Sequence, residues 1–422
     1  MIARDGRRPG RRRHDGRPAR SGSSSRRIIA LAAVMALVGG GGLGVRASAG
    51  AQTARPHARG NGAYAADGVL KPPAIPGRLG LLADLVVLNE RSGLVYLGDI
   101  ANAQVDVWSV KSRRFVGAMR GGFGGEMGFP SFARSGPTGA MVDDLGQLWA
   151  GNGDGSLVIG EARPPFAETD VVRTGSSGRA DELDYDPADR VVLVTNPAET
   201  AVRSHRRTPR PYVTLIDAVP DTSGRHHVLA HIVIPGAGLD SLEQPKWDAG
   251  IHAFVMSVRK TSANANGEVV VIDPRTRRLR RVIPLRRPCH PSGMAVGPAH
   301  ALPDRLGGGA ERDLLLGCQN QPPLIVGDRT GKVEASFTGE GACCGDEVWF
   351  NAADGRYYAA ESGNSRFGPA VMVIDARTRR FIANIPITDT SGLFHAVTAG
   401  YRDALVFVPE SDGVHVFRRQ TP

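Results

Sequence analysis

One stretch of the sequence occurs twice, and this repeat constrains the fold more than any other feature. Residues 271–284 read VIDPRTRRLRRVIP, and residues 373–386, which lie 102 positions later, read VIDARTRRFIANIP. A related stretch, IVGDRTGKVEASFTG, lies between them at 325–339, so the underlying period is about 50 residues. Each copy predicts a strand, a turn opened by Asp and a returning strand, because an Asp side chain caps such turns.

A second repeated stretch supplies the other half of the unit. Residues 181–196 read DELDYDPADRVVLVTN and match DEVWFNAADGRYYAAE at 346–361, and related stretches begin near 84, 138, 243, 291 and 395. Seven units with four short strands each predict an all-β, seven-bladed β-propeller with four antiparallel strands per blade. The last unit ends after its third strand. We therefore predict that residues 69–76 supply the missing outer strand, which closes the ring and makes 69–420 one domain.

The first 49 residues have the features of an export signal. Arg26 and Arg27 precede an apolar run that begins at Ile28 and is too short to span a bilayer, and small residues follow at 47–52. The Arg pair resembles a twin-arginine signal, and an ordinary Sec signal with an Arg-rich start is the alternative. We expect residues 50–68 to form a flexible lead-in. The mature protein is then periplasmic or extracellular and has no transmembrane segment.

The net charge gives little support to nucleic-acid binding. The formal charge is +10, but residues 1–46 hold eleven Arg and two acidic residues, so +9 of it falls there and only +1 on the rest. A nearly neutral domain lacks the electrostatic footprint of a nucleic-acid binder. Basic stretches at 203–211 and 275–281 are the exceptions. We expect a monomer whose partner is a small molecule or another protein.

Several short stretches carry a resemblance to a known family. LVTN at 193–196 is followed by YVTLIDA at 212–218, and the VIDPRT and VIDART turns come later. With these stretches the sequence resembles the YVTN-type β-propeller repeat proteins, over residues 69–420. The resemblance implies an exported or surface-associated seven-bladed propeller, and it is specific for architecture only. Covalent haem, which some related propeller enzymes carry, is not supported because the sequence has no Cys-x-x-Cys-His stretch.

Polar residues at equivalent positions of the inner strands are the candidate site, because these positions converge on the propeller axis. The set is Glu182, Glu243, Gln244, Glu347, His395 and His290. Carboxylates that face one axis can hold a divalent cation: Ca or Mg with oxygen ligands, and Mn or Zn when imidazole joins them. The alternative is that these groups only hydrogen-bond ordered water and the backbone of neighbouring blades.

Two functions remain open from the sequence. The first is a binding or interaction module with its ligand in the axial funnel. The second is a metal-dependent hydrolase or lyase of the lactonase kind, in which the axial Glu and His residues hold a metal that polarises a carbonyl or activates water.

The four cysteines point to disulfides, because an exported chain folds in an oxidising compartment. Cys289 opens the first strand of the fifth unit and Cys318 closes the second, so the two ends are adjacent and we predict that they pair. Cys343 and Cys344 leave three alternatives open: a vicinal disulfide, cross-pairing with the fifth unit, or soft metal ligands.

Overall fold

The computed structural model describes residues 63–73, 80–127, 133–198, 210–302, 308–363, 368–388, 394–400 and 404–420. Its contacts divide the chain into two units, 1–40 and 41–422, and every described residue belongs to the second. The predicted export signal, residues 50–62 of the lead-in and residues 203–209 of the first basic stretch lie outside the described residues. Among the described residues, no helix has the length and apolarity that crossing a membrane requires.

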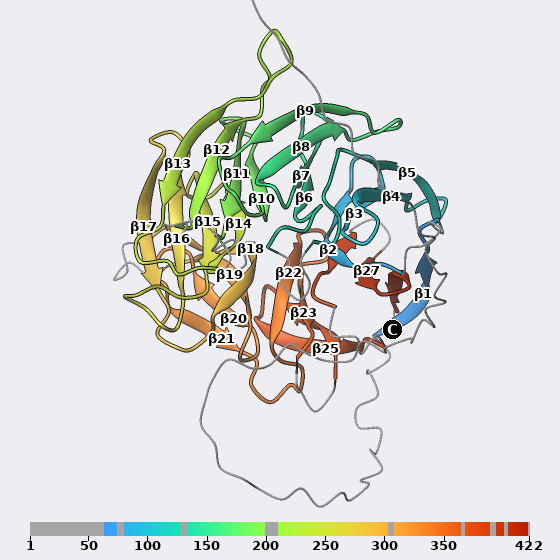
Figure 1. Ribbon diagram of the computed structural model, residues 1–422. Helices are drawn as coiled ribbons and strands as arrows, with labels where there is room; N and C mark the ends of the chain where they lie inside the picture. The colour runs from blue at the N-terminus through green and yellow to red at the C-terminus, as the bar shows by residue number, and fades with distance from the viewer. Residues whose placement is uncertain are drawn as a thin grey trace, which may run out of the picture. The chain divides into compact units, whose positions relative to one another are not determined.

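The described residues form seven four-stranded antiparallel sheets that follow one another around a common centre (Figure 1). Blades 1 to 3 are formed, in order, by β2 (Ala83–Asn89), β3 (Leu94–Asp99), β4 (Gln104–Ser109) and β5 (Arg114–Met119); β6 (Ala140–Val142), β7 (Gln147–Gly151), β8 (Ser156–Glu161) and β9 (Glu168–Arg173); β10 (Leu183–Asp186), β11 (Val191–Asn196), β12 (Tyr212–Asp217) and β13 (Val228–Val233).

Blades 4 to 7 are formed by β14 (Leu242–Asp248), β15 (Ala253–Val258), β16 (Glu268–Asp273) and β17 (Arg278–Pro284); β18 (Pro291–Ala301), β19 (Ala310–Cys318), β20 (Leu324–Gly327) and β21 (Val333–Ser336); β22 (Gly345–Asn351), β23 (Arg356–Glu361), β24 (Ala370–Asp375) and β25 (Arg380–Pro386); β26 (Thr398–Gly400), β27 (Leu405–Glu410), β28 (Gly413–Arg419) and β1 (Tyr64–Leu70). The first strand of each blade contacts the first strand of the next, and β26 contacts β2, so the ring is closed. The predicted seven-bladed propeller is confirmed.

The repeated stretch that predicts the fold forms the outer half of blades 4 and 6. In blade 4 it spans β16, a turn and β17, and the turn is held as expected: Asp273 Oδ1 accepts hydrogen bonds from the backbone N of Arg275 at 2.9 Å and of Thr276 at 3.1 Å. Arg277 then adopts a left-handed φ of 56°. Arg379, at the equivalent place in blade 6, has a φ of 57°. The two copies of the repeated stretch, in blades 4 and 6, therefore form turns with the same backbone conformation at this position.

The closing strand exists, but it lies earlier in the chain than predicted. β1 spans Tyr64–Leu70 and pairs with β28, with Tyr64 opposite Arg419 and Leu70 opposite Val414. The prediction of 69–76 was wrong in position because it took Ile75-Pro76 as the end of an outer strand, by analogy with other blades. Residues 64–68, which we assigned to the lead-in, belong to this strand. As an outermost strand, β1 has a largely exposed surface and no apolar run to mark it.

The hydrophobic core is divided into seven clusters, and each cluster lies between two consecutive blades. The cluster between blades 7 and 1, for example, joins Phe407 of β27 to Trp108 of β4, and Leu70 of the closing strand belongs to it. Both faces of a blade are therefore buried, which explains fully buried strands such as β11. A single blade has no core of its own, so stability depends on closure of the ring.

Candidate ligand site at the propeller axis

The candidate site is built where the first strands of the blades begin. Glu182 immediately precedes β10, Gln244 is the third residue of β14, and Glu347 is the third residue of β22. The pairing of β14 shifts between Leu242 and Pro245, and that of β22 shifts between its first and fourth residues. Such bulges locally redirect side chains. They fall on the segments that carry Gln244 and Glu347.

Three of the six predicted residues meet across the axis, and we call Glu182, Gln244 and Glu347 the axial cluster. Gln244 Nε2 donates a hydrogen bond to Glu347 Oε2, and Gln244 Oε1 accepts one from the backbone N of Met294 at 2.7 Å. The carboxyl groups of Glu182 and Glu347 are hydrogen-bonded to each other. Blades 3 and 6 are not neighbours, so these two carboxyls reach each other only across the centre of the ring.

The two carboxyls of the axial cluster both have raised pKa values. Burial, followed by the nearby charge of Glu347, raises the pKa of Glu182 well above its ordinary value. Burial and the charge of Asp346 likewise raise the pKa of Glu347, whereas its hydrogen bond with Glu182 lowers it. Burial and the neighbouring acids thus favour the protonated form of both carboxyls. The other oxygen of Glu182, Oε2, has no hydrogen-bond partner, although the residue is only 6% exposed.

Glu243 lies beside the axial cluster but belongs to a buried ion pair. Arg259 Nε is 3.0 Å from Glu243 Oε1, and Arg259 Nη1 is 3.2 Å from Asp240 Oδ2. The amide oxygen of Gln319, when it faces Arg259, accepts a hydrogen bond from Nη2 at 2.6 Å. Burial raises the pKa of Glu243, and the positive charge of Arg259 opposes that rise. A guanidinium thus occupies the position beside Glu243 that a metal would need.

The two histidines do not enter the axial cluster. The backbone oxygen of His395 accepts a hydrogen bond from Glu347 N at 2.9 Å, but the ring Nε2 of His395 is 3.2 Å from Asp84 Oδ1 of blade 1. The ring of His290 faces a loop of blade 4, with Nε2 at 2.9 Å from the backbone oxygen of Ala265. Both rings are thus engaged at the periphery of the site rather than at its centre.

The predicted divalent metal finds no support in these side chains. In the part of the chain that the structure describes, no group of three or more His, Cys, Asp and Glu residues is arranged to hold a metal ion. The reason is visible in the contacts: Gln244 and Glu182 bind the Glu347 carboxyl, and Arg259 binds Glu243. Most of the carboxyl groups considered for a metal thus contact other side chains in this structure, and the metal-dependent hydrolase or lyase stays a prediction.

Acidic residues outnumber basic residues around the axial cluster. Three basic residues interact with the acids there, and one of them, Arg179, is 2.9 Å from Asp181 Oδ2. The basic residues are Arg179, Lys246 and Arg259, and the acids are Asp84, Asp181, Glu182, Asp240, Glu243, Asp346 and Glu347. A site with this excess of acids favours a positively charged ligand.

Sequence reasoning missed three residues of this site: Arg259, Asp84 and Lys246. Arg259 directly follows β15, where a base at the end of a buried strand reads as ordinary surface charge. The useful signal was Glu243 in β14, the strand that precedes β15, since a buried acid needs a nearby base. Asp84 lies in the second position of β2, one blade beyond His395, and only ring closure brings the two together.

The cysteines form two disulfides. Cys289 pairs with Cys318 at a Cα–Cα distance of 4.7 Å, which confirms the predicted link between the ends of β18 and β19. Cys343 pairs with its neighbour Cys344, the vicinal alternative among the three. Both are therefore oxidised, so the soft-ligand and cross-pairing alternatives do not apply.

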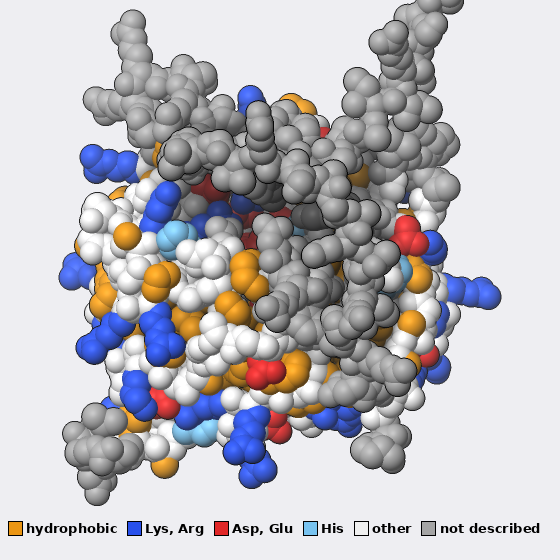
Figure 2. All heavy atoms as spheres, turned by 90° about the horizontal axis from the view of Figure 1, so that it is seen from below, with side chains coloured by type: hydrophobic (Ala, Val, Ile, Leu, Met, Phe, Trp, Pro, Cys, Tyr) orange, Lys and Arg blue, Asp and Glu red, His pale blue; other side chains and the backbone are white. Residues whose placement is uncertain are grey.

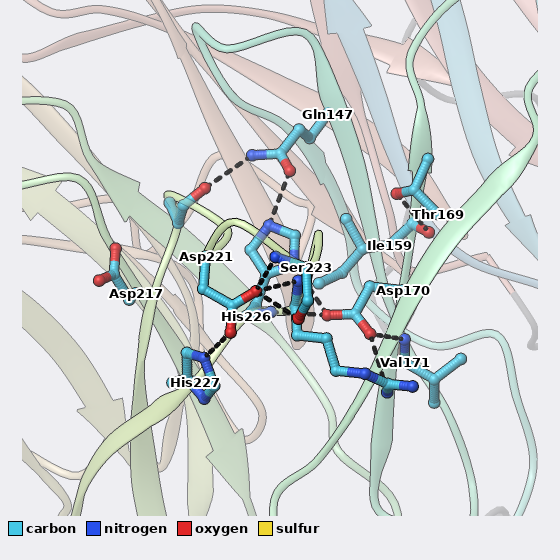
Figure 3. A network of polar contacts seen from close by, with 12 residues as sticks. Gln147, Ile159, Thr169, Asp170, Val171, Asp217, Asp221, Ser223, His226 and His227 are labelled. Atoms are coloured by element: carbon cyan, nitrogen blue, oxygen red, sulfur yellow. Dashed lines mark hydrogen bonds and ion pairs between the residues drawn. The ribbon is translucent and has the colours of Figure 1, made fainter.

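A second polar network links blades 2 and 3 away from the axial cluster. His226 Nδ1 lies 3.0 Å from Asp170 Oδ2, and His226 Nε2 lies 2.8 Å from Gln147 Oε1 (Figure 3). The edge of the imidazole also meets Trp149, with ring centroids 4.9 Å apart. The His226 side chain is 2% exposed. We interpret this buried network as a connection between the blades.

The basic residues of the outer strand at 275–281 are used within the fold. Arg275 Nε is 2.6 Å from Asp189 Oδ2, Arg280 Nη1 donates to the backbone oxygen of Ile251, and Arg281 donates to backbone oxygens of blade 5. On the face that Figure 2 shows, Lys and Arg side chains are spread around the perimeter rather than gathered in one patch.

The fold and the site define a class of protein: a seven-bladed β-propeller with an acid-rich cluster on its axis. Among solved structures, a chain in a crystal structure of a mitotic checkpoint complex is similar, with a TM-score of 0.58, 13% sequence identity, and coverage of 90% of this chain and 98% of that chain. A likeness at this identity shows the fold alone. No protein-family model and no curated protein matches the sequence, so the YVTN resemblance stays a prediction.

Proposed function

We propose that this protein is a binding module that holds a positively charged ligand at its axial cluster. The observation that carries the proposal is Glu182 Oε2, a carboxyl oxygen without a hydrogen-bond partner in a residue that is 6% exposed. A buried polar atom without a partner is uncommon in folded proteins and calls for an explanation. An N–H donor from a ligand would satisfy this oxygen.

The chemistry of the cluster selects an ammonium or guanidinium group. A cation next to Glu182 and Glu347 would offset the repulsion between the carboxyls and allow Glu182 to release its proton. Among the described residues, an anion would meet seven acids and three bases there. The ligand is thus an organic amine or a basic side chain of a partner protein, and nucleic acid does not suit the site.

We place this activity outside the cytoplasm. The signal-like residues 1–49 support export, and the two disulfides support an oxidising compartment, where such bonds persist. Cell fractionation followed by N-terminal sequencing of the mature protein tests this part: we expect a start near residue 50 in the exported fraction, and an intact N-terminus in the cytoplasm would contradict it.

Calorimetric titration with small probes tests the ligand class. Agmatine and propylamine should bind the wild-type protein, and propionate should not. Glu347→Gln should weaken agmatine binding at least about tenfold, which corresponds to about 1.4 kcal/mol. Glu168→Gln, a change of an exposed acid on the outer strand of blade 2, is the matched control and should leave binding unchanged. Equal binding of propionate, or an unchanged affinity in Glu347→Gln, would contradict the proposal.

A further inference from the structure

The two disulfides of this chain lie in different surroundings. Cys289 and Cys318 are both 0% exposed and belong to the hydrophobic cluster between blades 4 and 5. Cys343 and Cys344 are half-buried, on the segment that leads from β21 of blade 5 into β22 of blade 6. An attacking thiolate must reach a sulfur atom for exchange to occur. Only the second disulfide offers that access without unfolding.

The backbone at the second disulfide is held in an unfavourable conformation. Cys344 has a φ of 71°, in the left-handed region that residues other than Gly rarely occupy. Such a conformation is unfavourable and persists only where the surrounding structure imposes it. A disulfide between neighbouring residues ties both side chains into a small ring around one peptide bond. Breaking it would free Cys344 to adopt an ordinary conformation.

A buried acid lies against the same segment. Gly363 N donates to the backbone oxygen of Cys343 at 3.2 Å, so the residues after β23 pack on the disulfide. Glu361, the last residue of β23, pairs with Gly345, and a Cβ atom on Gly345 would lie 2.7 Å from Glu361 Oε1. Neither oxygen of Glu361 has a hydrogen-bond partner. Burial raises the pKa of Glu361 to about 8, so this carboxyl carries a proton at neutral pH.

We propose that the Cys343–Cys344 disulfide is a thiol–disulfide exchange site that accepts two electrons from an external dithiol, whereas Cys289–Cys318 is a structural disulfide. One thiolate of the dithiol attacks a sulfur of the pair, the Cys–Cys bond breaks, and the leaving cysteine thiolate takes up a proton. The second thiol of the dithiol then attacks the mixed disulfide. The dithiol is oxidised to its disulfide, and Cys343 and Cys344 each end as a thiol.

In this scheme Glu361 supplies the proton to the leaving thiolate, because its carboxyl lies against Gly345, the residue that follows Cys344. Its own carboxylate is then reprotonated from solvent once the segment has relaxed. The pair also lies close in sequence to Glu347, since Gly345 and Asp346 alone separate Cys344 from it. The exchange chemistry itself does not rest on the proposed axial ligand.

Differential alkylation of the full oxidised chain tests the assignment. The protein is incubated without denaturant with increasing dithiothreitol, quenched with iodoacetamide and digested with trypsin, which separates the two disulfides because Lys332 lies between Cys318 and Cys343. We expect Cys343 and Cys344 to be labelled together, at a rate roughly a hundredfold above that of Cys289 and Cys318. Labelling of both pairs at one rate, or of neither without denaturant, would overturn the proposal.

Two sets of variants test the role of the Cys343–Cys344 disulfide and the role of Glu361 separately. Cys343→Ser combined with Cys344→Ser should fold and lose all labelling under native conditions, and retained labelling would show that another cysteine reacts. Glu361→Gln should slow reduction by dithiothreitol about tenfold below pH 8 and little above it, and Glu361→Asp should restore part of the rate. An unchanged pH profile in Glu361→Gln would remove Glu361 from the mechanism.

Discussion

Replacing Glu361 with Met should stabilise the protein, and the gain should grow with pH. Glu361 is fully buried at the end of β23, and neither of its carboxyl oxygens has a hydrogen-bond partner. Met fills a similar volume without a polar atom. Below the ordinary carboxyl pKa the wild-type residue is a neutral acid, and its unsatisfied polar atoms cost about 1–3 kcal/mol. We expect Glu361→Met to recover that amount at acidic pH.

The pH dependence follows from the titration of the same group. Burial raises the pKa of Glu361 from 4.5 to about 8 in the folded protein. The folded form therefore keeps its proton where the unfolded form has lost it. The favourable contribution is complete below pH 4.5, declines as pH rises, and is exhausted once the pH passes about 8. At about 1.4 kcal/mol per pKa unit, the wild type loses about 5 kcal/mol over this window, and Glu361→Met loses none of it.

Urea unfolding of the oxidised protein between pH 5 and pH 9 measures this difference. The free energy of unfolding of Glu361→Met should exceed that of the wild type by an amount that rises by about 4 kcal/mol across the series, because part of the loss has already occurred at pH 5. Glu361→Gln is the matched control, because it keeps a polar group but cannot titrate, and its difference from Glu361→Met should not vary with pH. A pH-independent difference between wild type and Glu361→Met would refute the reasoning, since it would mean that the carboxyl ionises as freely as in water.

Three further predictions concern the ring and its connections. Removing residues 1–71, and with them the closing strand Tyr64–Leu70, should abolish cooperative thermal unfolding, whereas removal of residues 1–62 should preserve it; equal melting curves would contradict the role of this strand. Cys289→Ala with Cys318→Ala should lower the free energy of unfolding by about 3–4 kcal/mol, because the bond closes a loop with a separation of 29 residues, and a urea midpoint within error of wild type would argue against it. His226→Ala should cost about 2–4 kcal/mol at pH 7 through lost hydrogen bonds. Burial raises the pKa of Asp170, but the hydrogen bonds from His226 outweigh this effect and lower it. The stability that these bonds contribute is therefore present above the ordinary carboxyl pKa and is lost as the pH falls. The cost of His226→Ala should shrink in urea unfolding at pH 3, and an equal cost at pH 3 and pH 7 would refute this prediction.

The blade count was readable from the sequence because each blade repeats its own local chemistry. The turn after β16 uses Asp273 to bind two backbone N–H groups, and the same letters recur in blade 6. Turn geometry depends on neighbours within a few residues, so it is visible in the sequence of a single unit. The continuous apolar strands follow from the burial of both faces of a blade, which is also a local pattern.

The closing strand was predicted in kind but not in place. β1 is an outer strand with one solvated side, so it carries no apolar run, and the Ile75-Pro76 pair that we used as its marker lies beyond its end at Leu70. The register of such a strand is set by its partner β28, through pairs such as Leu70 with Val414. That partner lies at the other end of the chain, so no local pattern identifies the pairing.

The sequence by itself determined the seven blades, the candidate acids at the starts of the inner strands and the pairing of Cys289 with Cys318, because these depend on residues within one repeat. Tertiary structure decided which of those acids meet. Glu182 and Glu347 are brought together from blades 3 and 6, Arg259 takes Glu243 away from them, and His395 turns to Asp84. These contacts depend on distances across the closed ring. The sequence names each Glu or Asp but does not show whether its carboxyl group is exposed, paired or protonated.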